Sequence, residues 1–523
     1  MNLREILCKY LFKPLKNKDL NHVLCYNIDC KQTQNMAVYM LSKFTSKIST
    51  ISTFFQDFPL SRFLSSANFY KRGNAKANGL SILELFSSSL LAIFTRSSLN
   101  ELAKSDLLNS DKSLSKSSAH RYMENEKFNW RKLQLNISSS VITKIESFNN
   151  PNRITTLSID DSIISRGRSK NVEGASLIHD HTDNSYKKGF YYLLLAWSDG
   201  STTIPVDFAL TSSKKLVNED INYINDRRCT AHKRKQDCFK GKPELVIDML
   251  KRTAKFGIRA DYVLFDTWFT NAPLVSQIRK IGYHVIGMLK NMRKTTYKFN
   301  GEYYTLGQIK TRLKKENKFN KKGNIYGWCI VETKPTENAP KPLKVKLLFV
   351  RDRNNSNKTL CLLCTDLSLS NEDIIVTYAK RWNIEVMFKN QKQHLKLVSG
   401  SCSRKYSSII AYVTQVCICN TIIEYTKRIN EDFRSIGGIF LDMCEALKDL
   451  PYHFAIARLI NSFKTFFCAL LKNECIKKNQ IQSATQTYEE LLNEWSKEQS
   501  TFMQRFLDSI ENMFVEKVNI SCK

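Results

Sequence analysis

The sequence predicts an α/β protein in which helical regions flank a mixed β-sheet, and three observations lead to this fold class. The 523 residues are 42% hydrophobic and 25% charged, a balance typical of folded domains, and the chain is long enough for several of them. Short apolar runs separated by turn residues begin after Pro151 and predict strands. Helical periodicity dominates the sequence on both sides of these runs. We therefore expect a central sheet with helical regions at both ends.

Residues 1–150 are expected to form a helical DNA-binding region. Apolar residues between positions 83 and 94 recur at helical intervals. In residues 112–122, serines precede a short basic stretch, as in a helix-turn-helix, where Lys116 and Arg121 would suit phosphate contacts. A plain helical bundle is an equally good interpretation of this stretch.

Residues 151–290 predict the first part of a catalytic core. Three strands come first, and Asp199-Gly200 marks a turn between the second and third. Alternating helices and strands follow, which gives the order βββαβαβ and favours a mixed sheet. The predicted strands cover residues 154–159, 189–197, 203–210, 262–265 and 284–289, and the helices cover 243–256 and 274–281.

Residues 291–366 predict a β-rich insertion, because short alternating segments surround a hairpin dipeptide, Asn300-Gly301. From residue 371 the pattern is helical. We assign residues 367–400 to the second part of the core and residues 401–523 to a helical C-terminal region that could dimerise the protein. The strands expected in the insertion are 296–299, 303–306, 325–332, 343–350 and 358–365.

The charge of the chain predicts a polyanionic partner. The sequence contains 80 Lys and Arg against 49 Asp and Glu, a net charge of +31. Nucleic acid is the usual partner of such a protein, since each neutralised phosphate releases counterions. The basic stretch at residues 227–240 could follow a DNA backbone or form a solvated loop. A membrane partner is disfavoured, because the most apolar stretch, residues 409–423, is interrupted by polar residues and suits a buried helix better.

The fifteen cysteines do not suggest disulfides. They are scattered through a long chain in which we see no export signal. We therefore expect reduced thiols and a cytoplasmic location.

Aspartates at two predicted strand ends are candidates for catalysis. Asp160 and Asp161 close the first strand, and Asp266 closes a later one. Aspartates at such positions often only cap a turn. Two strand-end aspartates in one sheet nevertheless favour a shared cleft.

A helical stripe after residue 377 supplies a third acidic group. At about 100° per residue, Tyr378, Arg381, Glu385 and Lys392 fall within about 60° of one helix face. A solvated salt-bridge face would explain Arg381 with Glu385 at i, i+4, but not the tyrosine and lysine on the same stripe.

Phosphoryl transfer explains this combination of residue types. Carboxylates on separate elements can hold two Mg²⁺ ions about 3.5 to 4 Å apart for in-line displacement. Arginine would grip a phosphate as a fork, and lysine as a point charge. Tyr378 could donate a hydrogen bond or pack against a sugar.

The order βββαβαβ, with two aspartates and then a glutamate on a following helix, resembles the ribonuclease-H-like core of DDE transposases. The spacing Tyr-x2-Arg-x3-Glu-x6-Lys is similar to the Y-R-E-K signature of the IS-four group of bacterial insertion sequences, and the resemblance covers roughly residues 154–397. It implies Asp160, Asp266 and Glu385 as ligands of two Mg²⁺ or Mn²⁺ ions. Asp161 is the alternative first ligand, and Ser162 replaces the threonine that usually follows in the family.

The resemblance also implies a function. We expect cut-and-paste DNA transposition on terminal inverted repeats and target DNA by a homodimer, in the bacterial cytoplasm near the nucleoid. A nuclease without strand transfer and an inactive DNA-binding descendant are the alternatives. Trp268, Trp328 and Trp382 are expected to pack in the core, although each could instead stack on an unpaired base.

Overall fold

The computed structural model describes a large part of the chain, namely residues 57–70, 81–99, 116–167, 171–180, 183–213, 227–321, 323–352 and 358–441, with a few isolated positions. The chain divides into two compact units, which we describe separately. The larger unit comprises Leu60–Tyr70 and Arg121–Ile436. The smaller unit comprises Met1–Pro59, Lys71–His120 and Gly437–Lys523.

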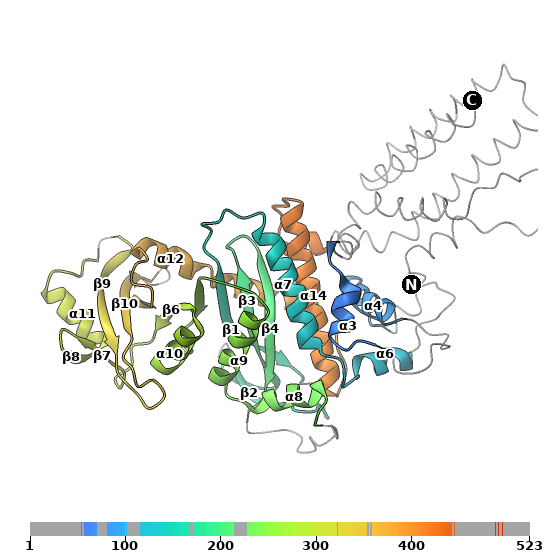
Figure 1. Cartoon of the computed structure of the whole chain (residues 1–523), viewed down its shortest axis with the longest axis horizontal. Coiled ribbons are helices and arrows are strands. Elements are labelled where there is room, and N and C mark those ends of the chain that lie inside the picture. The colour runs from blue at the N-terminus through green and yellow to red at the C-terminus, as the bar shows by residue number, and fades with distance from the viewer. Residues whose placement is uncertain are drawn as a thin grey trace, which may run out of the picture. The chain divides into compact units, whose positions relative to one another are not determined.

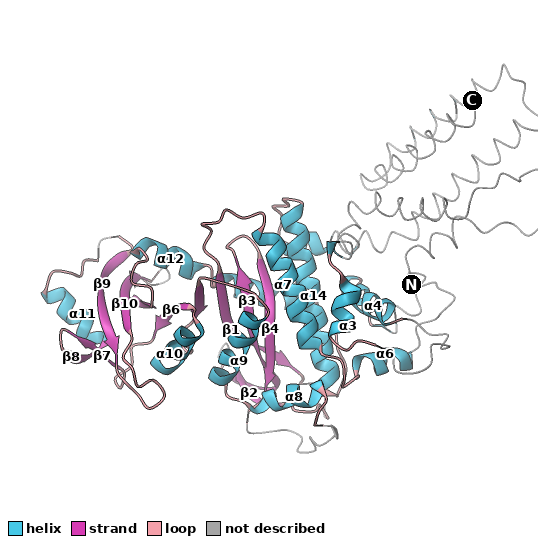
Figure 2. Ribbon diagram, in the orientation of Figure 1, coloured by secondary structure: helices cyan, strands magenta, loops and turns pink. Residues whose placement is uncertain are grey.

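A mixed sheet of eleven strands is the framework of the larger unit (Figure 2). The strand order is β2-β3-β1-β5-β6-β11-β10-β9-β7-β8, and β4 pairs with β3. The pairs β1–β5 and β5–β6 are parallel, and the other pairs are antiparallel. The strands are β1 (Thr156–Ser165), β2 (Ser176–Asp180), β3 (Ser185–Ser198), β4 (Thr203–Thr211), β5 (Tyr262–Phe265), β6 (His284–Leu289), β7 (Thr296–Phe299), β8 (Glu302–Thr305), β9 (Ile325–Thr333), β10 (Lys344–Arg351) and β11 (Thr359–Cys364).

The predicted order βββαβαβ is confirmed, and it forms the sheet order β4-β3-β1-β5-β6. Antiparallel strands come first along the chain, and the helical crossovers then add two parallel strands, which is the ribonuclease-H-like arrangement that was expected. The turn at Asp199-Gly200 is also present. Gly200 adopts a φ of +96°, and the Asp199 carboxylate accepts hydrogen bonds from the backbone of Ser201 and Thr202. Strand β2 was not predicted.

Helices cover the sheet of the larger unit (Figure 1). Helices α7 and α14 lie side by side and pack against β4, while α9 packs against β3 and β4. Helix α13 packs against β1, and α12 packs against β6. These helices therefore surround the strands that carry the candidate aspartates. The helices of this unit are α3 (Leu60–Ser66), α7 (Trp130–Glu146), α8 (Thr230–Gln236), α9 (Lys242–Lys255), α10 (Ala272–Ile281), α11 (Leu306–Lys315), α12 (Asn371–Ala379), α13 (Trp382–Gln393) and α14 (Tyr406–Ile429), together with a short 3₁₀ turn, Asp237–Phe239.

Helix α14 is long and apolar enough to cross a membrane by composition alone. In the fold, however, 94% of its most apolar window is buried inside the protein. It packs against α7 and β4, as a core helix does. The prediction of a buried helix here is confirmed, and the helix is no sign of a membrane protein.

The strands of the predicted insertion continue the same sheet, because β11 pairs directly with β6. The hairpin at Asn300-Gly301 is present between β7 and β8, and both turn residues have positive φ values, 50° and 90°. Helix α11 was not predicted. It begins at a capping box in which Thr305 and Gln308 bond reciprocally.

Part of the predicted helical regions lies outside the described residues. The described residues of the smaller unit include α4 (Ile82–Phe94), which starts with a capping box between Ser81 and Glu84. Helix α6 covers Lys116–Met123, but residues 112–115 of the predicted helix-turn-helix lie outside the described residues. The same is true of almost all of the C-terminal region beyond residue 444. The predicted DNA-binding and dimerisation roles of these regions stay predictions.

Candidate active site

Adjacent parallel strands bring Asp160 and Asp266 to the same level of the sheet. The pairing of β1 with β5 ends at Ser158 opposite Leu264. In both segments the aspartate, Asp160 or Asp266, comes two residues later. The prediction that the strand ends at Asp160 and Asp161 was wrong. Strand β1 continues to Ser165, because its pairing with β3 extends from Thr156 to Ser165. Asp160 therefore lies inside β1, just beyond the level at which β5 ends.

Asp160 and Asp161 have different partners, as expected for neighbours on one strand. The Asp160 carboxylate lies 3.3 Å from Nη1 of Arg381. The Asp161 carboxylate instead pairs at 2.9 Å with Lys242, the first residue of α9. Asp160, and not Asp161, therefore belongs to the group that includes the Y-R-E-K helix.

The predicted stripe is not one continuous helix. Helix α12 ends at Ala379 and α13 begins at Trp382. At the junction, the amides of Lys380 and Arg381 donate to carbonyls only three residues back, so the last turn is tightened. The prediction of a single helix was wrong, because hydrophobic periodicity does not reveal a tightened turn.

Three of the four stripe residues nevertheless contact β1 or β5. Arg381 Nη2 donates to Glu385 at 2.7 Å while Nη1 of the same guanidinium faces Asp160. Lys392 donates to the Ser162 hydroxyl at 2.7 Å. The Tyr378 hydroxyl lies 3.5 Å from the carbonyl of Phe265, the residue before Asp266. Arg381 thus links Glu385 to Asp160, Lys392 contacts Ser162 on the same strand, and Tyr378 lies beside the end of β5. Ser162 joins them as a partner that the sequence had indicated only as a substitute for threonine.

The electrostatics of the site reflect an excess of negative charge in a partly buried place. Burial raises the pKa of Asp160 to about 7, and the nearby Asp266 and Asp161 carboxylates add to this effect. The Asp161 amide and Arg381 act in the opposite direction but do not cancel it. Burial likewise raises the pKa of Tyr378 to about 12. Tyr378 is thus a neutral hydrogen-bond donor near pH 7.

The donor set of the site suits divalent cations. Its three carboxylates come from separate elements, and oxygen ligands are those that Mg²⁺ and Mn²⁺ prefer. Two of the carboxylates already converge on one cationic group, the Arg381 guanidinium. Among the described residues, no three acidic, histidine or cysteine side chains are close enough to form a ready-made metal centre. The set therefore suits metal ions by its chemistry, and Arg381 lies between two of its carboxylates.

Three tryptophans expected in the core are exposed. Trp268, which follows Asp266, is 54% exposed, and Trp382, which precedes Glu385 by three residues, is 60% exposed. Trp328 on β9 is 48% exposed. The expectation of core packing was wrong. Alternating burial along β9 directs Trp328 outward. Trp268 lies in the turn that follows Asp266, and Trp382 is the first residue of α13.

The basic stretch at residues 227–240 is not a solvated loop, and its contact with DNA stays a prediction. Its central residues form α8, where Arg234 and Lys235 are buried. Arg234 pairs with Asp207, and Lys235 contacts Glu173. Buried acidic partners, which lie far away in the sequence, account for this difference.

Comparisons with known proteins agree with this site. A family described as DDE superfamily endonuclease matches residues 69–302, which include Asp160 and Asp266. A second family, described as archaeal putative transposase ISC1217, matches residues 202–427, which include Asp266 and Glu385. No curated protein matches the chain.

Among the solved structures similar to part of the chain is the strand transfer complex of the Drosophila P element transposase. The identity is 10% and the TM-score is 0.23, over 55% of this chain and 57% of that one. The chain thus spans little more than half the length of that transposase.

The two family matches overlap and together extend from residue 69 to residue 427, so they cover the sheet, both aspartates and the Y-R-E-K helix. They do not distinguish the IS-four group from other members of the superfamily. Enzymes of this superfamily generally use divalent metal ions. The chain therefore contains a long region that is similar to DDE-superfamily endonucleases and to a transposase family.

Proposed function

We propose that this chain is a DNA transposase that cleaves the ends of an insertion sequence and joins them to target DNA, by a cut-and-paste route. One observation carries the proposal: Asp160 on a strand and Glu385 on a distant helix both contact the guanidinium of Arg381. Asp266 is close enough to raise the pKa of Asp160. Two acidic groups from separate elements thus contact a single cation and a third lies near one of them, which supports a site for metal-dependent phosphoryl transfer.

Asp160, Asp266 and Glu385 would hold two divalent ions, Mg²⁺ or Mn²⁺. When bound, the ions would lower the pKa of the attacking water or hydroxyl and stabilise the leaving oxygen. The structure favours Asp160 over Asp161 as the first ligand, because Asp161 is already paired with Lys242.

The basic stripe residues would bind the DNA phosphates beside the scissile bond. Arg381 is a planar fork that can exchange a carboxylate for a phosphate without losing charge-assisted hydrogen bonds. Lys392 is half-buried, and this burial lowers its pKa. Beside Ser162 it would provide a point charge at the edge of the site. Tyr378, neutral at pH 7, would donate a hydrogen bond to the DNA backbone or pack against a sugar.

The partners would be double-stranded DNA at the terminal inverted repeats and at the target. The net charge of +31 supports binding of both. Joining two element ends to one target needs two active sites, so we propose a homodimer on DNA, acting in the cytoplasm at the nucleoid. Sizing of the complex with end DNA under cleavage conditions would test this, and a single protomer per complex would contradict it.

The direct test of the activity uses a duplex carrying the inverted repeats that flank the gene, incubated with the full chain and Mg²⁺. Glu385→Gln keeps the shape of the side chain but removes its charge. We expect cleavage to fall by about a thousandfold or more. Glu372→Gln is the matched control, because Glu372 is exposed on the neighbouring helix α12. It should cleave like the wild type.

The products separate the alternatives. Joined element–target molecules support transposition, whereas cleavage without any joined product would favour a nuclease. Absence of any metal-dependent product from the wild type would indicate an inactive DNA-binding descendant. Equal cleavage by the wild type and Glu385→Gln would remove the proposed site.

A further inference from the structure

A second charged cluster lies in the larger unit and shares no residue with the acidic site. Its centre is Asp207 on β4, a fully buried carboxylate. Three arginines contact this carboxylate: Arg131 at 3.2 Å, Arg252 at 2.8 Å and Arg234 at 3.5 Å. Arg131 also pairs with Asp237 at 2.8 Å.

The cluster carries more positive than negative charge. The three arginines supply three positive charges, and Asp207 and Asp237 supply two negative ones, which leaves an excess of one. Lys240 also contacts Asp237 at 3.4 Å, but it pairs more closely with Asp248, at 2.8 Å, and so does not add to this excess. Burial lowers the pKa of Arg234 to about 10, and repulsion from Arg131 contributes. Such a cluster is incompletely neutralised by the protein itself.

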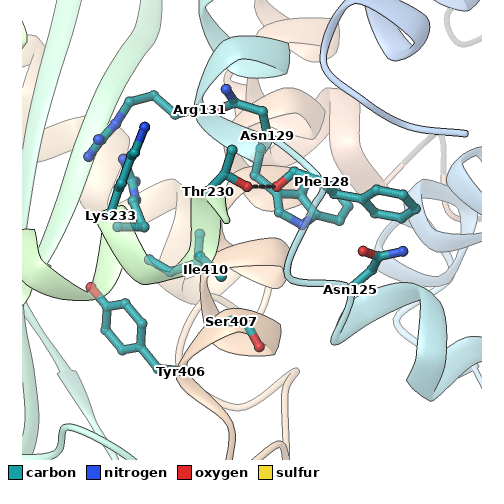
Figure 3. Close-up of a pocket in the computed structure, with 12 residues that line it drawn as sticks. Asn125, Phe128, Asn129, Arg131, Thr230, Lys233, Tyr406, Ser407 and Ile410 are labelled. Atoms are coloured by element: carbon teal, nitrogen blue, oxygen red, sulfur yellow. Dashed lines mark hydrogen bonds between the residues drawn. The ribbon is translucent and has the colours of Figure 1, made fainter. Parts of the chain in front are cut away.

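A cavity of about 150 Å³ opens beside this cluster (Figure 3). Arg131, Lys233 and Arg234 line it, and Arg131 and Lys233 extend toward the same side of it in Figure 3. Its wall also contains Phe128, Trp130 and Tyr406. The volume is enough for several water molecules and so for a small oxyanion.

Several buried donors in the wall of the cavity have no hydrogen-bond partner within the described part of the chain. Arg234 is only 6% exposed, and its Nε is without a partner. Nη2 of Arg131 and the indole Nε1 of Trp130 are also buried and also have no hydrogen-bond partner among the described residues. Buried N–H groups are normally satisfied, so these three point to a ligand that accepts hydrogen bonds.

The first turns of two long helices also line the cavity. Residues 129–131 are the N-cap and first turn of α7, which has 17 residues, and residues 406–407 begin α14, which has 24. Helix N-termini favour anions through their free N–H groups and the helix dipole. The Tyr406 amide already donates to Glu173 and the Lys132 amide to Asn129, so the donors left for a ligand come mainly from the cationic side chains.

We propose that this cavity is a binding site for a phosphate group, separate from the acidic site. Donors on several sides suit a tetrahedral oxyanion, which has acceptor oxygens in every direction, better than a carboxylate, which accepts along one edge. The phosphate could belong to a DNA backbone or to a small phosphorylated molecule. Both sources present the same chemistry to Arg131, Lys233 and Arg234.

The test titrates inorganic phosphate into the full chain at constant ionic strength, with chloride as the compensating anion. Binding is followed by calorimetry and by tryptophan fluorescence. We expect saturable binding and a fluorescence change that disappears in Trp130→Phe. Lys233→Gln should weaken binding three- to tenfold, roughly the effect of losing one exposed charge-assisted contact. Lys233 is exposed, so this variant should fold normally.

Lys251→Gln is the matched control, because Lys251 is an exposed lysine on α9 that does not line the cavity. It should bind phosphate like the wild type. Absence of saturable binding, equal affinity in Lys233→Gln, or a fluorescence change that persists in Trp130→Phe would each overturn the proposal.

A second arm identifies the source of the phosphate. A short DNA duplex that displaces bound phosphate would support a backbone phosphate as the natural ligand. Phosphate binding that persists at saturating duplex would support a small phosphorylated molecule. Neither measurement requires a metal ion or DNA cleavage, so failure of the proposed transposition would leave this inference unaffected.

Discussion

Two clusters of the sheet unit join arginine to carboxylate in opposite proportions. In the acidic site, one arginine, Arg381, pairs with two carboxylates, and the carboxylate of Asp266 lies near one of them. In the buried cluster, one carboxylate, Asp207, serves three arginines. The chemistry of the pairs is the same, but the acidic site has an excess of negative charge and the buried cluster an excess of positive charge.

The pKa values follow this difference. Burial raises the pKa of Asp160, and one arginine among several carboxylates does not reverse this effect. Burial acts on Asp207 in the same direction, but its three arginines prevail and hold its pKa well below the usual range. In each cluster, the direction of the carboxylate's pKa shift thus shows which charge is in excess. The acidic site lacks cations, and the basic pocket lacks an anion.

The largest effect is expected from neutralising a proposed metal ligand. Asp160→Asn should reduce cleavage of the inverted-repeat duplex by about a thousandfold or more, because the carboxylate is lost from a metal site. Asp161→Asn is the natural comparison, since Asp161 pairs with Lys242, and it should lose less than about tenfold. A larger loss in Asp161→Asn than in Asp160→Asn would exchange the roles of the two aspartates.

The next effect concerns stability and contrasts the clusters directly. Asp207→Asn leaves three buried guanidinium groups without their shared carboxylate and should destabilise the protein by about 3 to 5 kcal/mol. Asp160→Asn should leave stability unchanged or raise it at pH 8, because the charged carboxylate is disfavoured in its buried place. Urea unfolding of both variants at pH 8 measures this. Similar destabilisation by the two substitutions would refute the contrast.

The pH dependence should also reveal the acidic site. The pKa of Asp160 is raised from 3.8 to about 7, so the folded metal-free protein favours the protonated form. Its contribution to stability is therefore fully present below pH 3.8 and is lost as the pH rises through about 7. Metal binding requires the carboxylate, so affinity for Mn²⁺ should be roughly tenfold higher at pH 8 than at pH 6. Calorimetric titration at both values checks this, and equal affinities would count against Asp160 as a ligand.

A smaller effect is expected at the edge of the acidic site. Lys392→Gln should weaken binding of end DNA by about three- to tenfold, because a single phosphate contact is lost. The salt dependence of binding should become shallower by about one counterion. Lys389→Gln on the same helix, at an exposed position outside the stripe, is the control. An unchanged salt dependence in Lys392→Gln would remove Lys392 from the DNA-binding surface.

Much of the framework was predictable, because it depends on local patterns. The alternation of side chains along a strand implies that Asp160 and Asp161 point to opposite faces of the sheet. The dipeptides Asp199-Gly200 and Asn300-Gly301 predicted the turns at these positions, because few residues other than glycine and asparagine adopt a positive φ readily. The spacing of four residues likewise predicted that Arg381 and Glu385 lie next to each other on one helix face.

Other features depend on distant segments and could not be read from such patterns. The extension of β1 beyond Asp160 follows from its pairing with β3. The tightened turn between α12 and α13 lies within an apparently continuous helical pattern. The exposed positions of Trp268 and Trp382 also depend on the surrounding fold, because tryptophan suits both a core and a surface that binds a ligand.

The sequence by itself determined the charge, the order of the strands and the residue types able to hold metal ions. Only the tertiary structure decided that Arg381 lies between Asp160 and Glu385, and that Arg234 faces Asp207 in a buried cluster instead of solvent. The physical reason is that residue type and spacing act over a few neighbours. The burial and partner of a charged group, by contrast, are set by segments that folding brings together from far along the chain.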